Sequence, residues 1–198
     1  MDYGRLSSME IERMSRSLGP GGCVVEANRP LSTLLGSCVA VCLFDTGTQI
    51  GGMNHFMLPQ MSKSRHHDED VLLAGDACME ALLNTMLARG AARHRIRAKA
   101  FGGGNVIECK LPSALSIGKR NADFTREWLD RENIPLLASD FLGPWSRKVL
   151  FAPQTGDVWC KRMTTNLASA EALRREEEAY AASLLQKPAA GEKKIELF

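Results

Sequence analysis

The sequence predicts an α+β protein, a layered α/β sandwich built on mostly antiparallel strands with two packed helices. Strand-forming runs outnumber helical runs, and most of them follow one another directly along the chain, which favours antiparallel neighbours. The central pair of runs, residues 39–44 and 50–58, is apolar on both of its faces. A sheet that is apolar on both sides must be covered on both sides, so we expect layers rather than an open sheet.

The chain of 198 residues divides into one domain and two flanking segments. Residues 1–22 are expected to form a polar N-terminal tail, because Gly-Pro-Gly-Gly at 19–22 ends any short helix there. Residues 23–163 carry the alternating strand and helix patterns of a folded domain. Residues 164–198 are predicted to be a charged helix and a flexible C-terminal tail. The apolar residues of that helix are mostly small, so we expect it to pack lightly or protrude.

Two amphipathic helices are expected in the domain. Residues 69–89 repeat apolar side chains at helical spacing, with acids at the start and Gly90 suited to the C-cap. Residues 118–131 show a second helical pattern that ends at Asn133. The remaining strands are expected at 23–27, 96–101, 134–138, 149–152 and 157–162.

The hairpin formed by residues 39–44 and 50–58 brings a thiol and an imidazole to one face. If Thr46-Gly47 is a two-residue turn, Cys38 lies directly opposite His55, and their Cβ atoms are roughly 4.5–5.5 Å apart. A four-residue turn instead places His55 opposite Ala40, diagonal to Cys38 but still on the same face. Both registers bring the two groups close enough to interact.

The residues before Cys38 suit a nucleophile. Gly36 can adopt unusual dihedral angles, and it lets a substrate approach the backbone closely. Backbone N–H groups at Gly36 and Ser37 could stabilise an oxyanion. A neighbouring imidazolium favours the thiolate, which lowers the pKa of the cysteine. The alternative is that Cys38 is a small core residue and His55 a buried, hydrogen-bonded histidine.

Composition narrows the function classes. A net charge of +2 gives no indication of nucleic-acid binding. The six cysteines form no CxxC pair, so neither a zinc ribbon nor a redox dithiol is expected, and we expect no cofactor and no metal. The start of the chain lacks a signal-peptide core, and no apolar run is long enough to span a membrane. These patterns predict a reduced, cytoplasmic protein that is not inserted into a membrane.

Several motifs resemble those of the CheD family, the chemoreceptor glutamine deamidases of bacterial chemotaxis. They are GSCVAVCLFD with GGMNHFMLP, FGGGNVI at 101–107, IGKRN at 117–121, WLDRENIPLLASD at 128–140 and RKVLFAPQTGDVWCKR at 147–162. The resemblance covers about residues 23–163, which makes that segment a CheD-like deamidase domain. It implies Cys38 as the catalytic cysteine and His55 as the histidine. The family triad ends in a threonine shortly before the cysteine; spacing favours Ser32 and residue type favours Thr33.

The resemblance implies a protein-glutamine glutaminase, an amidohydrolase that converts glutamines of methyl-accepting chemotaxis receptors to glutamate with release of ammonia. It also implies a partner phosphatase of the CheC type. From the residues alone, only a thiol hydrolase follows. Two alternatives stay open: a non-catalytic module that docks receptors or a CheC-type phosphatase, and another thiol enzyme such as a peptidase or a cell-wall amidase.

Overall fold

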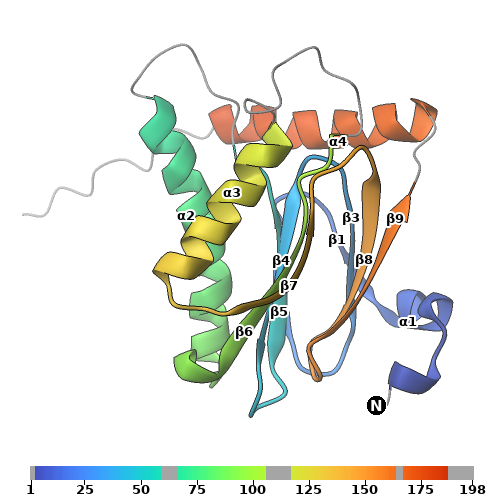
Figure 1. Ribbon diagram of the computed structural model, residues 1–198, viewed down its shortest axis with the longest axis vertical. Coiled ribbons are helices and arrows are strands. Elements are labelled where there is room, and N and C mark those ends of the chain that lie inside the picture. Colours follow the sequence, from blue (N-terminus) through green and yellow to red (C-terminus); the bar gives the residue numbers. More distant parts are fainter. Residues whose placement is uncertain (1–2, 59–66, 106–116, 164–166, 187–198) are drawn as a thin grey trace, which may run out of the picture.

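Two β-sheets form the centre of the protein, shown in a computed structural model that describes residues 3–58, 67–105, 117–163 and 167–186 (Figure 1). One sheet has five strands in the order β2-β5-β4-β6-β7, and the other has four in the order β1-β3-β8-β9. Neighbours are antiparallel except for β1 with β3 and β6 with β7. The strands are β1 (Arg16–Leu18), β2 (Cys23–Glu26), β3 (Leu31–Leu35), β4 (Val39–Asp45), β5 (Gly51–Phe56), β6 (Ile96–Gly102), β7 (Leu136–Phe141), β8 (Ser146–Ala152) and β9 (Asp157–Met163).

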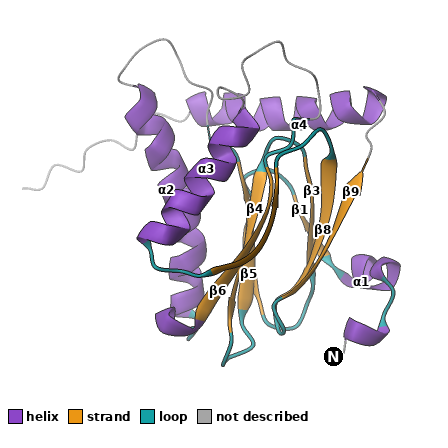
Figure 2. Cartoon of the chain, in the orientation of Figure 1, coloured by secondary structure: helices purple, strands orange, loops and turns teal. Residues whose placement is uncertain are grey.

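Helices lie on three sides of these sheets (Figure 2). The helices α2 and α3 cover the outer face of the five-stranded sheet, α1 lies beside β8, and α4 runs across the ends of the strands (Figure 1). The layered α+β class is therefore confirmed. The helices are α1 (Ser8–Met14), α2 (His67–Ala88), α3 (Ile117–Arg131) and α4 (Leu167–Gln186), with short 3-10 turns at Tyr3–Arg5 and Arg93–Arg95.

Strand β4 is buried along its whole length because its two faces belong to two different cores. Val39, Val41 and Leu43 pack with side chains of α2 and α3. Cys38, Ala40, Cys42 and Phe44 pack between the two sheets, against residues of β3 and β8. The expectation that the central hairpin is covered on both faces is thus correct.

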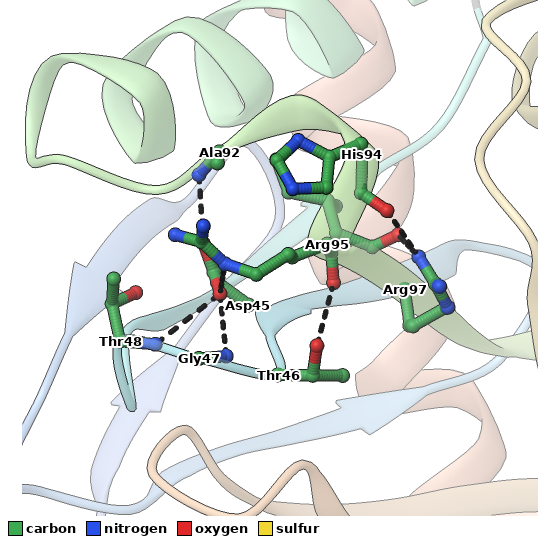
Figure 3. A network of polar contacts seen from close by, with 9 residues as sticks. Asp45, Thr46, Gly47, Thr48, Ala92, His94, Arg95 and Arg97 are labelled. Carbon is green, nitrogen blue, oxygen red and sulfur yellow. Dashed lines mark hydrogen bonds and ion pairs between the residues drawn. The ribbon is translucent and has the colours of Figure 1, made fainter.

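The prediction of a two-residue turn is wrong, and the alternative of a four-residue turn is confirmed. His55 pairs with Ala40, and Cys38 lies just before the first residue of β4. The cause is the Asp45 carboxylate, which accepts hydrogen bonds from the N–H groups of Gly47 and Thr48 and so widens the turn (Figure 3). The same carboxylate accepts from the Ala92 N–H and pairs with Arg95.

The N-terminal segment differs from its expected form. Tyr3 and Ile11 are buried against Leu150 of β8, so residues 3–22 are packed on the domain instead of forming a polar tail. Two strands were not foreseen: β1, and β3, with which it pairs in parallel. At the other end, α4 packs lightly on the domain, one of the two expected forms, since Leu173 and Glu177 are buried. The predicted tail at 187–198 lies outside the described residues.

Candidate active site

The turn at residues 36–38, which joins β3 to β4, is the centre of the site. All three of its carbonyl oxygens accept hydrogen bonds from one side. Gly102 has a φ of +122°, and a Cβ there would lie 2.1 Å from the Cys38 carbonyl oxygen, so only glycine allows this approach. In a trans peptide unit the N–H points opposite to the carbonyl, so holding the Gly36 and Ser37 carbonyls directs the N–H groups of Ser37 and Cys38 away from these donors. The carbonyls of Gly36, Ser37 and Cys38 accept from the Gly104 N–H (2.7 Å), Asn121 Nδ2 (2.8 Å) and the Gly103 N–H (2.8 Å).

The N–H groups of the turn converge on one carboxylate, that of Glu177 in α4. Gly36 and Cys38 donate to Oε1 over 3.0 and 3.1 Å. The N–H and the hydroxyl of Ser37 donate to Oε2 over 3.1 and 2.6 Å. We call these four donors the anion cradle. Convergent backbone N–H groups of this kind stabilise negative charge on an oxygen.

Thr33 and Leu18 orient the imidazole of His55. Thr33 Oγ1 lies 2.8 Å from His55 Nδ1 and donates its own proton to the Leu18 carbonyl over 2.7 Å. Its oxygen therefore accepts from Nδ1–H, which leaves Nε2 as the unprotonated nitrogen. The parallel pairing of β1 with β3 sets Leu18 beside Thr33 and makes this relay possible.

Of the two hydroxyls that the sequence offered, Thr33 is the one that reaches the imidazole. Ser32 lies next to it on β3, so its side chain faces the other way, and its Oγ accepts from the hydroxyl of Ser15 over 2.8 Å. The alternation of side chains along a strand separates the two, because neighbouring residues point to opposite faces.

Three chemically active groups meet at this point. Cys38 Sγ, a ring nitrogen of His55 and a carboxylate oxygen of Glu177 lie within 4.8 Å of one another, and all three side chains are buried. His55 Nε2 has no hydrogen-bond partner among the described residues. A buried nitrogen with a free lone pair beside a thiol is positioned to take the thiol proton.

The charge states of Cys38 and His55 differ from the thiolate–imidazolium pair that the sequence predicted. Burial, followed by the charge of Glu177 and a hydrogen bond to it, raises the pKa of Cys38 well above its usual value. Burial also lowers the pKa of His55 to about 4, although the Glu177 charge acts in the opposite direction. With α4 in place, the site therefore holds a neutral thiol and a neutral imidazole, not a thiolate and an imidazolium.

The same three side chains could in principle hold a metal ion, since thiolate, imidazole and carboxylate are zinc ligands. The two oxygens of Glu177, however, already accept two hydrogen bonds each from the anion cradle. A carboxylate offers about four acceptor positions in total. A metal would have to displace these donors, so the arrangement fits an anion held by backbone groups better than it fits a metal ligand.

Three parts of the site had no role in the sequence-based prediction. Asn121 binds the turn from α3, and its Oδ1 accepts from the Leu58 N–H over 2.8 Å. The glycines at 102–104 entered the sequence analysis only as part of a family motif, and they allow the close approach of the 36–38 turn. Glu177 was missed, although a lone acid between Leu173 and Tyr180 on one helical face was a readable signal.

Within the described residues, no helix combines the length and the apolar character that crossing a membrane requires.

Comparisons with known proteins agree with the motifs. A family model described as CheD chemotactic sensory transduction matches residues 57–162. A probable chemoreceptor glutamine deamidase CheD 2 of Dechloromonas aromatica (strain RCB) is 62% identical over 198 residues, which is all of both chains. A protein of the same name from Burkholderia thailandensis is 41% identical over 200 residues, again all of both chains. The probable chemoreceptor glutamine deamidase CheD of Saccharophagus degradans is 37% identical over 94% of this chain and 85% of its own.

Among solved structures, Bacillus licheniformis hypothetical protein YfiH overlaps 62% of this chain and 51% of its own, with 13% identity and a TM-score of 0.39. That likeness is too remote to carry a functional argument. The family model and the full-length relatives lead to one conclusion: the chain belongs to the CheD family.

Proposed function

We propose that this protein deamidates glutamine side chains of methyl-accepting chemotaxis receptors, with Cys38 as the nucleophile. The observation that carries the proposal is the meeting of three groups in one buried place: the Cys38 thiol, the anion cradle, and His55 Nε2, which no described residue hydrogen-bonds. The names of the full-length relatives, which describe chemoreceptor glutamine deamidases, supply the substrate.

The geometry suggests a sequence of steps. His55 Nε2 takes the proton of Cys38, and the thiolate attacks the side-chain amide carbon of glutamine. The oxygen that becomes negative accepts hydrogen bonds from Gly36 and Cys38 N–H. The imidazolium gives its proton to the departing nitrogen, ammonia leaves, and a thioester remains. Water, deprotonated by His55, then cleaves the thioester and leaves glutamate.

Thr33 acts as a positioning residue in this scheme. By accepting from Nδ1–H, it keeps Nε2 as the nitrogen that faces the thiol. When Nε2 takes the proton and the imidazole becomes charged, the Thr33 oxygen on Nδ1–H and the Leu18 carbonyl behind it stabilise the positive charge.

A receptor fragment incubated with the purified protein tests the proposal by mass spectrometry. Each conversion of glutamine to glutamate adds about one dalton, and Cys38→Ala should abolish it. The matched control is Cys42→Ala, four residues further on the same face of β4, which should keep full turnover at a stability cost of about 1 kcal/mol. Turnover by the Cys38→Ala protein would refute the assignment.

The non-catalytic alternative makes the opposite prediction. A module that only docks receptors or a CheC-type phosphatase would bind the fragment without changing its mass, and it would do so equally well with alanine at position 38. The relevant measurement is binding of the receptor fragment alongside the mass change, in both proteins.

A further inference from the structure

Helix α4 places a glutamate where the proposed chemistry needs a glutamine. Glu177 has the same chain length and shape as the substrate side chain, and its charged form is the product of the reaction. Its Oε1 accepts from the two backbone N–H groups of Gly36 and Cys38, which is the contact that the oxyanion of the substrate requires. Its carboxylate also lies within 4.8 Å of the nucleophile and the base.

Asp45 shows what a structural carboxylate looks like in this fold. It too is buried and accepts from three backbone N–H groups, but Arg95 adds two hydrogen bonds and a positive charge (Figure 3). The donors to Glu177 are all neutral, and among the side chains that the structure describes no cation pairs with it. A buried charge without a cation is costly. The cradle is therefore built for a group that is neutral before reaction.

The face of α4 that carries Glu177 also contacts the domain through neighbouring side chains. Leu173, Glu177 and Tyr180 follow at i, i+4 and i+7, so they form one stripe. Leu173 and Glu177 lie against Gly36, where a Cβ would come within 3.0–3.1 Å of them. Tyr180 lies against Gly21, where a Cβ would come within 2.6 Å of its ring. Two glycines thus open the surface for a helix at this position.

The outward face of α4 is polar. The side chains of Glu171, Arg175, Glu176 and Glu178 are exposed, so the stripe is the face by which the helix is held. The docking surface therefore fits a helix that carries one central carboxylate or carboxamide with apolar side chains four residues before it and three residues after it.

We propose that α4 is an intramolecular pseudosubstrate, which occupies the surface where the substrate glutamine docks on a helix of its own. This inference rests on the proposed function, because it identifies the Glu177 position with that of the glutamine. A receptor helix must displace α4 before reaction, and weakening the α4 stripe accelerates turnover. The burial of Cys38 under α4 keeps its thiol protonated until that exchange happens.

The sharpest test converts the pseudosubstrate into a substrate. In the Glu177→Gln variant, the Cys38 sulfur forms a bond to the amide carbon of the introduced side chain, the C–N bond breaks, and ammonia leaves with the proton from His55. Water then cleaves the thioester, so the net reaction turns the introduced glutamine and one water into glutamate and ammonia.

We expect the peptide that contains position 177 to gain about one dalton without any receptor present. The matched control is Glu176→Gln, an exposed neighbour on the same peptide, which should keep its glutamine. The double variant Cys38→Ala with Glu177→Gln should also stay unchanged. If the glutamine introduced at position 177 persists while receptor glutamines are converted, α4 does not present a substrate-like side chain and the inference is overturned.

A second measurement does not depend on catalysis. Iodoacetamide should alkylate Cys38 about three times faster in Leu173→Ala and in Glu177→Ala than in the unaltered protein, because both changes weaken the stripe. Exposed Cys23 serves as the internal reference, and Glu171→Ala, at an exposed position of the same helix, is the matched control. An unchanged Cys38 rate would show that α4 does not guard the site.

The two measurements separate the two proposals. If neither the receptor nor the glutamine introduced at position 177 is converted, the proposed function fails, and the pseudosubstrate inference fails with it whatever the alkylation rates. If receptor glutamines are converted, Leu173→Ala should raise kcat/KM for the receptor fragment, and a lowered value would overturn the inference alone.

Discussion

The two ends of the described chain both reach the Cys38–His55 site, but they are attached in different ways. The N-terminal end is an integral part of the fold. Tyr3 and Ile11 are buried against β8, and β1 belongs to the four-stranded sheet because it pairs with β3. The C-terminal helix α4 lies across the strand ends without joining a sheet, and it is held by one stripe of side chains.

This difference indicates separate roles for the two ends. The N-terminal segment supplies the Leu18 carbonyl that orients Thr33 and, through it, His55. It cannot leave without breaking the β1–β3 pairing. Most of the stability of a helix in a protein comes from packing of one face and not from intrinsic propensity, so α4 depends on its docking and can detach while the sheets stay intact. The N-terminal segment supplies part of the site, and α4 covers it.

Stability measurements should show the largest contrast. Ile11→Ala should lower the free energy of unfolding by about 2–4 kcal/mol, since Ile11 is fully buried and its loss leaves a cavity. Leu173→Ala should cost less than about 1 kcal/mol, because the loss is limited to the free energy with which α4 docks. Urea denaturation checks both values. A cost for Leu173→Ala as large as that for Ile11→Ala would make α4 part of the same cooperative unit.

Turnover should respond to the relay from the N-terminal end. Thr33→Val keeps the shape of the side chain but removes the oxygen that fixes the His55 tautomer, and we expect kcat to fall about 10–100-fold. Thr33→Ser restores the oxygen and should recover most of the rate. Steady-state kinetics on a receptor fragment would decide the matter, and equal rates for the valine and serine variants would leave a Cys38–His55 dyad without a third member.

Patterns with a regular period predicted much of this fold. The helices expected at 69–89 and 118–131 appear at His67–Ala88 and Ile117–Arg131, and the strands expected from residue 96 onwards all appear. Both faces of β4 were expected to be covered, and both are. These elements could be predicted because burial of one or both faces of a helix or strand produces a regular spacing of apolar residues in the sequence.

What the sequence could not show depends on contacts between distant segments. The hairpin register followed from Asp45 binding both its own turn and Arg95, fifty residues away. The choice between Ser32 and Thr33 depended on the existence of β3, which fixes the face on which each side chain lies. Glu177 is about 140 residues from the cradle it occupies, and no periodic pattern encodes such a contact.

The pH dependence of stability should separate the buried site from the turn of the hairpin. The His55 pKa is lowered to about 4 by burial, against about 6.5 when unfolded, so the unfolded chain binds more protons in this window. Stability should therefore fall as pH drops from about 6.5 to about 4. The Asp45 pKa lies well below its ordinary value, despite burial, because of the hydrogen bond from Arg95 and those from three backbone N–H groups. Its contribution is complete above about pH 4 and is lost below it.

Urea titrations at several pH values would measure these two contributions. His55→Gln should remove the loss between pH 6.5 and 4 and leave the steeper loss below pH 4. Asp45→Asn should leave the loss between pH 6.5 and 4 and reduce the loss below pH 4, to which Asp140 also contributes because Arg162 and Arg147 hold its pKa at about 2. In Leu173→Ala, the loss of stability between pH 6.5 and 4 could disappear as well. That result would show that α4 supplies the burial that lowers the His55 pKa, and it would sharpen the comparison between the two ends.

The smallest expected effect is that of Ser32→Ala. The Ser32 hydroxyl accepts a hydrogen bond from Ser15, at the end of α1, and does not touch His55. The Ser15 hydroxyl also lies 2.7 Å from the Glu12 carbonyl, so it keeps an acceptor when Ser32 is shortened. We expect a stability loss within about 1 kcal/mol and an unchanged kcat. If kcat instead fell as far as in Thr33→Val, the N-terminal segment would act on the site through the end of α1, and the relay through Leu18 would not explain how this end of the chain completes the site.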